Sequence, residues 1–280
     1  MNKCTLTIVI PTLNEELYLP LLLSDLEKQS NNDFAIIIVD AVSQDTTIKK
    51  CKDFSKTLNI SIIEVEKQNV SFQKNTGAQK ATSSHIIFLD ADMRVKKTFI
   101  SRVQKALNKD HTLHLLPHVV PIEKTNVDMT IFQLSNHLIE LSQFIGRPLP
   151  SSGCMIFERN YFNFIGGFDE KIIDKAGIGE DHEIMLKSRK AGVIARCDRS
   201  IEVQFSMRRL QKEGRMAFVR KYITSGLEIA RKGRLDKPLF EYKMGGHYFS
   251  DIGSPSGKRI TLRERIRNLE IIAEKVLKEL

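Results

Sequence analysis

The sequence contains no run of 18 consecutive apolar residues, which excludes an ordinary transmembrane helix. The first residues, MNKCTLTIVIPTLNEE, lack the pattern of a signal peptide, because their apolar run is short and acidic residues follow it closely. The cysteines form no CxxC pair, which argues against a disulfide framework and against a thiolate zinc site; they are Cys4, Cys51, Cys154 and Cys197. We therefore expect a protein that is made and kept in the cytosol.

Two catalytic signatures are also missing. His182 precedes Glu183, but no HExxH follows, which excludes zinc-protease chemistry at this point. The other histidines show no spacing typical of metal ligands, and no GxSxG is present to suggest hydrolysis. The sequence also contains no internal repeat.

The charge is unevenly spread along the 280 residues. The net charge of +9 arises in the last third, because residues 187–280 carry 23 Lys and Arg against 11 Asp and Glu. Such a region is expected to meet something anionic, such as phosphates or acidic lipid headgroups. A solvated basic face is the alternative.

Four short runs rich in β-branched residues are expected to be strands, at residues 6–10, 34–40, 60–65 and 85–90. Helix-like segments separate them, at residues 17–29, 45–58 and 70–82. Continuous apolar strands with helices between them are typical of a parallel sheet that is covered on both faces. The sequence therefore predicts an α/β wound sheet.

Two carboxylates, Asp90 and Asp92, come directly after the apolar run IIFL. Like charges about 4 Å apart repel by roughly 4 kcal/mol at the effective dielectric of a protein surface, so the pair needs a compensating cation or is an ordinary turn. Pro11 and the polar residues Thr12, Asn14 and Glu15 follow the first run, and Asp40 ends the second. Because ligands of wound sheets bind beyond the carboxyl ends of the strands, we expect these residues to share one rim.

Beyond residue 110 the pattern is less regular. Residues 112–120 resemble another strand, and residues 127–145 have apolar residues at the spacing of a helix. The stretch GRPLPSSG is typical of an exposed loop. We expect one domain over residues 1–205 and a basic, mainly helical extension over residues 206–280, whose last helix has an apolar stripe that favours core docking or dimerisation over membrane binding.

Five motifs occur in a characteristic order, namely PTLNEE, IIIVDAVSQD, NTGAQKAT with IIFLDAD, SGCMIFERNYFNFIGGFDE and GEDHEIMLKSRKAG. Together, over about residues 5–205, they resemble glycosyltransferase family 2 with its GT-A fold. The resemblance implies a mostly parallel, Rossmann-like wound sheet with helices on both faces. It also implies an inverting enzyme that moves a sugar from a nucleotide-diphosphate donor to an acceptor hydroxyl.

The resemblance makes Asp90 and Asp92 the DxD pair of the family. Asp92 would hold Mn²⁺ or Mg²⁺ against the diphosphate, and Asp90 would face the ribose or the waters of the metal. Residues i and i+2 of an extended segment point to one side, which presents hard oxygen ligands to such a cation. A bound metal would offset the repulsion between the two carboxylates and stabilise the departing diphosphate.

The same resemblance assigns Pro11, Thr12, Asn14 and Glu15 to the nucleotide-binding loop. It places Asp40 at the base, where a carboxylate can accept the imide N–H of uracil. For Asp40 and Asn14, helix capping is the alternative.

Lys74 and Asn75 stand where family members often have an Arg-Asn pair near the nucleotide. Lysine keeps the positive charge of arginine but lacks its bidentate fork. Val42 also departs from the family pattern, because a small residue is typical at that position. The turn after Asp40 is therefore expected to differ.

Asp181 in GIGEDHE corresponds to the general base of the family. An inverting transfer needs a carboxylate on the face opposite the leaving diphosphate, close enough to take the proton of the acceptor. Acids that favour a helix N-terminus are the alternative. Ser152, Gly153 and Glu180 correspond to positions near the acceptor or the donor sugar.

The segment FSMRRLQKEG resembles a tail found in some bacterial-type members of the family. In that reading Arg208 and Arg209 form a cationic lid over the diphosphate, and a surface role is the alternative. The implied partners are a nucleotide-diphospho-sugar, with UDP favoured, and a glycan, lipid-linked or small-molecule acceptor of cell-envelope synthesis. Nucleic acid is not expected, whereas a homodimer and peripheral membrane contact through the basic C-terminal region remain open.

Two other functions are alternatives. The resemblance also implies a sugar nucleotidyltransferase as an alternative, because its fold is similar, but that class is expected to carry a glycine-rich GxGxR-type loop after the first strand, and PTLNEE contains no glycine. A non-catalytic nucleotide-sugar-binding module predicts that one catalytic acid is missing. All four acids, Asp40, Asp90, Asp92 and Asp181, are present.

Overall fold

The computed structural model describes residues 5–109, 111–122, 125–151, 153–171, 179–232 and 245–246. By packing, the chain divides into two units, Met1–Ser250 and Asp251–Leu280, and only the first contains described residues. Ser152 and the predicted C-terminal helix therefore lie outside the described residues. The domain boundary expected after residue 205 stays a prediction.

One eight-stranded sheet organises the described part of the first unit, in the order β3-β2-β1-β4-β7-β6-β8-β5. The strands are β1 (Leu6–Thr12), β2 (Phe34–Asp40), β3 (Ile60–Glu64), β4 (His85–Leu89), β5 (Arg94–Val95), β6 (His114–Pro121), β7 (Cys154–Glu158) and β8 (Arg196–Phe205). β3, β2, β1 and β4 pair in parallel, as do β6 and β8, whereas β7 and β5 are antiparallel to their neighbours. The predicted wound α/β sheet is confirmed, and its antiparallel strands make it a mixed sheet.

Helices cover both faces of this sheet. They are α1 (Leu19–Glu27), α2 (Thr47–Phe54), α3 (Val70–Lys80), α4 (Phe99–Lys109), α5 (Asn126–Phe144), α6 (Arg159–Phe164), α7 (Gly179–Lys190), α8 (Arg208–Glu213) and α9 (Arg215–Lys232). Successive strand residues point to opposite faces, so Leu6, Ile8 and Ile10 of β1 pack with α1, α2 and α4, while Val9 packs with α3, α6 and α7. Burial on both faces explains why β1 is apolar without alternation.

Local signals in the sequence determine where several helices begin. Pro20 lies in the first turn of α1, where its missing N–H costs no hydrogen bond. The side chain of Asn69 caps α3 by accepting a hydrogen bond from the Phe72 N–H at 2.8 Å. Thr125 caps α5 in the same way.

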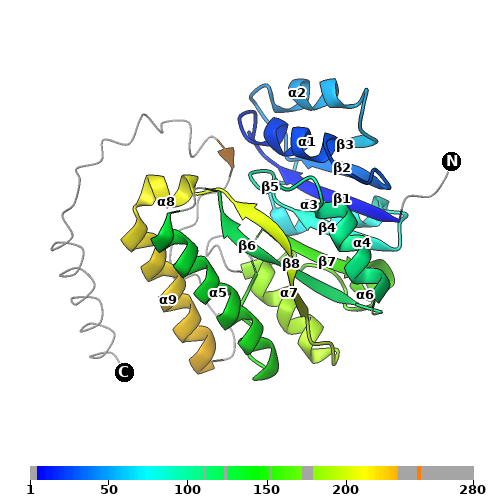
Figure 1. Ribbon diagram of the computed structural model, residues 1–280. Coiled ribbons are helices and arrows are strands. Elements are labelled where there is room, and N and C mark those ends of the chain that lie inside the picture. Colours follow the sequence, from blue (N-terminus) through cyan, green and yellow to red (C-terminus); the bar gives the residue numbers. More distant parts are fainter. Residues whose placement is uncertain are drawn as a thin grey trace. The chain divides into compact units, whose positions relative to one another are not determined.

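Helices α1 and α2 lie at the β1–β3 end of the sheet, and α5, α8 and α9 gather near β6 and β8 (Figure 1). Among the described helices, none combines the length and the apolar character needed to cross a bilayer.

Gly77 allows α3 to lie directly on β1 and β2. A Cβ atom at this position would stand 2.3 Å from Cγ1 of Val9 and 3.2 Å from Cγ2 of Val39. Both valines are fully buried, so neither can move aside easily. Lys74 lies three residues before Gly77 on the same helix, so this close packing also fixes the backbone position of Lys74.

We predict that Gly77→Ala lowers the free energy of unfolding by about 1–3 kcal/mol, because overpacking outweighs the gain in helix propensity. The matched control is Gly226→Ala in α9, where an added Cβ meets no atom within 4 Å. This control is expected to be neutral or to gain up to about 1 kcal/mol. Urea denaturation measures both, and equal stability of the two variants would contradict the packing described here.

Candidate active site

The carboxyl ends of β1, β2 and β4 bring the predicted polar residues to one edge of the sheet. Thr12 at the end of β1 is in register with Asp40 at the end of β2, and Asp90 follows the last residue of β4. The chain winds from β1 to β2 and β3 on one side, and β4 lies on the other side of β1. Such a switch in strand order leaves a crevice in which wound sheets bind their ligands.

Lys74 of α3 lies buried among three carboxylates. Its ammonium nitrogen is 3.2 Å from Asp181 Oδ1, 3.2 Å from Glu180 Oε1 and 4.0 Å from Asp90 Oδ1. The ring of Phe168 lies 5.0 Å from the same nitrogen. Burial alone would lower the pKa of Lys74, but the three carboxylates outweigh it and keep this pKa well above its ordinary value. Lys74 is therefore a permanent cation that joins the end of β4 to the start of α7.

Asp181 has the chemistry of a proton acceptor. Burial raises its pKa to about 8, Lys74 opposes that rise, and Glu180 and Asp90 add to it. Burial likewise raises the pKa of Asp90 to about 6, against the pull of Lys74. A carboxylate whose pKa lies near neutrality can take a proton from a substrate and still be ionised beforehand.

A second buried cation, Arg208 at the start of α8, lies on the other side of the site. Its two terminal nitrogens donate to both oxygens of Glu15, at 2.8 and 2.6 Å, and its Nε lies 2.9 Å from Asp92 Oδ2. The guanidinium group also stacks over the ring of Tyr18 at 4.6 Å. Burial raises the pKa of Glu15 to about 7, and Arg208 lowers it. Arg209 pairs with Glu213 at 3.0 Å, one turn further along the same helix.

The turn after β2 is held by Asp40. Ser43 donates to both of its carboxylate oxygens, through its N–H at 2.7 Å and its hydroxyl at 2.5 Å. The Ser43 hydroxyl in turn accepts from the Asn14 N–H, and Asn14 Oδ1 accepts from the Gln44 N–H at 2.7 Å. Val42 and Asn14 both have positive φ, +58° and +53°. A left-handed valine is rare, so this turn has an unusual backbone conformation.

Gln73 has a role that the sequence did not indicate, and Gly153 has a packing role besides the predicted one near the sugar or the acceptor. Gln73 Nε2 donates to the carbonyls of Thr12 and Val39, at 2.9 and 2.8 Å, and so ties α3 to the ends of β1 and β2. Gly153 has φ +86°, and its carbonyl accepts from the Asp90 N–H at 3.0 Å. A Cβ on Gly153 would lie 1.5 Å from Cε of Met93. Only glycine fits this close approach to the Asp90 turn.

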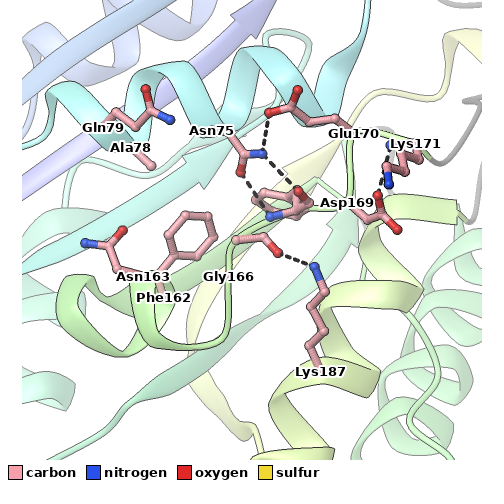
Figure 2. Close-up of a pocket in the computed structure, with 12 residues that line it drawn as sticks. Asn75, Ala78, Gln79, Phe162, Asn163, Gly166, Asp169, Glu170, Lys171 and Lys187 are labelled. Carbon is pink, nitrogen blue, oxygen red and sulfur yellow. Dashed lines mark hydrogen bonds between the residues drawn. The ribbon is translucent and has the colours of Figure 1, made fainter.

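Asn75 binds the GGFDE loop and not the carboxylates that surround Lys74. Its amide donates to the carbonyl of Phe168 and to Glu170 Oε1, both at 2.9 Å, and its oxygen accepts from the Phe168 N–H at 3.0 Å. Figure 2 shows Asn75 in this role, at the wall of a cavity of about 440 Å³. Asn75 therefore fixes the GGFDE loop, which positions Phe168 under Lys74.

The residues fit a divalent cation that is shared with a substrate. Among the described residues, no group of three or more His, Cys, Asp and Glu side chains is arranged to hold a metal by itself. Mg²⁺, however, is commonly held by one or two carboxylates together with phosphate oxygens and water. Asp90 and Asp92 supply two such carboxylates, and the contact of Arg208 with Asp92 shows that this position already attracts a cation.

The folded-state pKa values of Asp181 and Glu15, about 8 and about 7, lie well above the values near 4 of an unfolded chain. The folded protein therefore holds protons that the unfolded chain releases, and stability falls as the pH rises through this window. His114, whose pKa burial lowers to about 3, acts in the opposite direction only below about pH 6.5.

We predict that the ligand-free protein loses about 2 kcal/mol of stability between pH 6.5 and 8.5, as measured by urea denaturation. Asp181→Asn should flatten most of this slope. Asp198→Asn is the control and should keep it, because the pKa of Asp198 is lowered by Ser200 and Arg196 despite burial. A slope that is unchanged in Asp181→Asn would contradict the raised pKa of Asp181.

Comparison with known proteins supports the family resemblance that the motifs indicate. The chain matches the profile of glycosyl transferase family 2 over residues 7–166. It is similar to the poly(ribitol-phosphate) β-N-acetylglucosaminyltransferase TarS of Staphylococcus aureus, with 24% identity over 131 residues that make up 45% of this chain and 23% of TarS. The chain thus matches less than a quarter of the length of that relative.

Two solved structures share the fold. The crystal structure of S. aureus TarS 1-349 in complex with UDP matches with a TM-score of 0.57 and 19% identity, over 76% of this chain and 64% of that one. The mannosyltransferase PcManGT from Pyrobaculum calidifontis, in complex with GDP-Man and Mn²⁺, matches with a TM-score of 0.60 and 17% identity, over 84% and 66% of the two chains. The GT-A fold is therefore confirmed, and since the family profile spans more than half of the sequence, the chain belongs to glycosyl transferase family 2.

Proposed function

We propose that the protein transfers a sugar from a UDP-sugar to an acceptor hydroxyl, with inversion at the anomeric carbon and with a divalent metal at the diphosphate. One observation carries this proposal: buried Lys74 links Asp90, at the end of β4, to Asp181, at the start of α7. This contact supports assigning the expected diphosphate side and the expected base to one site. Family membership supports the reaction class, and the UDP complex of TarS supports the donor.

Asp181 acts as the general base. As the acceptor oxygen bonds to the anomeric carbon, the bond between that carbon and the diphosphate oxygen breaks, and the acceptor proton passes to a carboxylate oxygen of Asp181. Lys74, 3.2 Å from this carboxylate, lowers its pKa against the larger effect of burial and so raises its ionised fraction before the transfer. Glu180, held by the same lysine, is suited to accept a hydrogen bond from a sugar hydroxyl.

The diphosphate side of the site consists of Asp90, Asp92 and Arg208. The two aspartates would hold Mn²⁺ or Mg²⁺, whose chemistry is to neutralise the charge that develops on the leaving diphosphate. Arg208 is a buried cation next to Asp92, so it is suited to donate hydrogen bonds to oxygens of the diphosphate. In the structure it forms ion pairs with Glu15 and Asp92.

The base end of the site consists of the loop after β1 and the turn after β2. Asp40 is only 1% exposed and accepts hydrogen bonds from Ser43. We therefore assign to Asp40 the role of fixing the turn that lies next to the uracil. Thr12 and Asn14 belong to the same edge, and Asn14 is bonded to the turn through Gln44. Gly246 also reaches this loop, since its N–H donates to the Leu13 carbonyl at 2.9 Å.

We assign the acceptor to cell-envelope glycan synthesis, because the name of TarS specifies a poly(ribitol-phosphate) acceptor. The basic excess of residues 187–280 suits an acceptor that carries phosphate groups. On this view the enzyme works in the cytoplasm, at the inner face of the membrane.

A thermal-shift panel of nucleotides tests the donor and the metal. UDP at about 100 times its Kd should stabilise the protein by about 2.7 kcal/mol with Mn²⁺ present, because ligands that bind only the folded state raise its stability. Asp92→Asn should lose the metal-dependent part, whereas Asp53→Asn on the exposed face of α2 should keep it. Equal stabilisation by UDP in EDTA would reject the metal, and equal stabilisation by ATP would reject the preference for UDP.

Asp181→Asn tests the base. Turnover should fall by about 10²–10⁴-fold, the usual contribution of a positioned general base, while stabilisation by UDP and Mn²⁺ persists. Glu183→Gln is the matched control on α7, since Glu183 pairs with Lys187 at 3.2 Å and not with Lys74. Loss of nucleotide binding together with turnover in Asp181→Asn would count against this role.

A further inference from the structure

Helix α5 buries polar residues and exposes apolar ones. Asp128, Asn136, Ser142 and Gln143 are between 1% and 7% exposed. The amide of Asn136 exchanges two hydrogen bonds with the backbone of Val119 in β6, at 2.8 and 3.1 Å, which seats this polar face on the sheet (Figure 1). Phe132 and Ile139 of α5 pack against the core, whereas most of the other large apolar residues of this helix lie on the opposite side and are exposed. A contiguous exposed apolar patch commonly marks an interaction site.

The exposed apolar residues form one continuous stripe, which we call the α5 seam. It consists of Val127, Ile131, Leu134, Leu138, Leu141 and Ile145. Ile131 is half-buried, and the other five side chains are 47% to 65% exposed. The successive spacings are 4, 3, 4, 3 and 4 residues, which is the a/d repeat of a helix that packs against another helix.

We propose that the α5 seam is a homodimer interface, in which α5 packs antiparallel against α5 of a second copy of this chain. The spacing reads the same in both directions along the helix, as a two-fold axis requires when one surface pairs with itself. An axis between Leu134 and Leu138 pairs Leu134 with Leu138 of the second copy, and Ile131 with Leu141. It also pairs Val127 at the start of the seam with Ile145 at its end.

The flanks of the seam do not oppose this pairing. The residues beside it on the exposed side are Thr130, Ser135, His137 and Phe144, none of which brings a carboxylate, lysine or arginine against its own copy. Phe144, 68% exposed, adds to the apolar area. At roughly 100 Å² for each half-exposed large side chain, the seam would bury about 600–700 Å² per copy, close to the ~800 Å² per partner of a standard interface.

Two other occupants are the alternatives. Residues 262–280 repeat the same 4-3-4-3-4 spacing, in Leu262, Ile266, Leu269, Ala273, Val276 and Leu280, and a segment of one chain could in principle cover its own seam. A second copy is favoured because every position of the α5 seam is a large side chain, whereas Ala273 would leave one layer underfilled. A lipid surface is disfavoured because it suits a wide apolar face flanked by basic residues rather than a narrow heptad seam.

Cross-linking of the full chain tests the proposal. In one helix, positions 127 and 145 are about 27 Å apart, so a short bismaleimide cannot join them within a chain. The double variant Val127→Cys with Ile145→Cys should give a covalent dimer, because each position meets the other in the second copy. Val127→Cys alone, Ile145→Cys alone and the native chain should not give one. A covalent dimer from either single variant would indicate parallel packing and overturn the proposal, as would no dimer from the double variant.

Light scattering provides an independent measurement. For the native protein, the measured particle mass should be about twice the 32.0 kDa of one chain. Leu134→Asp with Leu138→Asp should weaken dimerisation by roughly 100-fold or more, since it places like charges at the centre of the interface. Phe164→Asp on α6, a residue that is 79% exposed, is the control and should leave the dimer intact. A monomeric native chain would overturn the proposal. The same holds if the native chain is monomeric and binds anionic vesicles through Leu134 and Leu138, which would indicate a membrane surface instead.

Discussion

The active-site edge depends on two buried cations that hold five carboxylates together. Asp90, Glu180 and Asp181 surround Lys74, while Glu15 and Asp92 surround Arg208. Without these cations the carboxylates would repel one another in a region with little water, where such repulsion is strongest. The cations come from α3 and α8, which are far apart in the chain, so the site is complete only when both helices are in place.

The two cations also affect different acids of the site. Lys74 lies on the side of the proposed base and raises the ionised fraction of Asp181, whose pKa burial pushes upward. Arg208 lies on the side of the DxD pair and already contacts Asp92. The proposed proton acceptor and the proposed metal ligands thus have their charges balanced by different neighbours.

Much of this arrangement could be read from the sequence, and the reasons are local. The runs that became β1, β2 and β4 are continuously apolar because they are buried on both faces, and the acids at their ends had to lie at one edge of a parallel sheet. Asp90, Asp92 and Asp181 were recognised from motifs with a fixed spacing.

What could not be predicted are contacts across long separations. Arg208 and Glu15 are 193 residues apart, and nothing in either segment names its partner. Asn75 follows Lys74 directly, yet on a helix adjacent residues point in different directions, so one reaches the carboxylates and the other the GGFDE loop. The exposure of the α5 seam was hidden for a related reason, because a helical period does not tell which of its faces the sheet will cover.

The seat of Gly77 on Val9 and Val39 also affects which substrates the fold can come to accept. The wall of the crevice that carries Lys74 has no slack even for a methyl group, so it can hardly retreat to admit a bulkier sugar. On the proposed function, a change of donor would therefore require substitutions elsewhere in the site, for example around Gly153 or at the start of α8, and not a shift of α3.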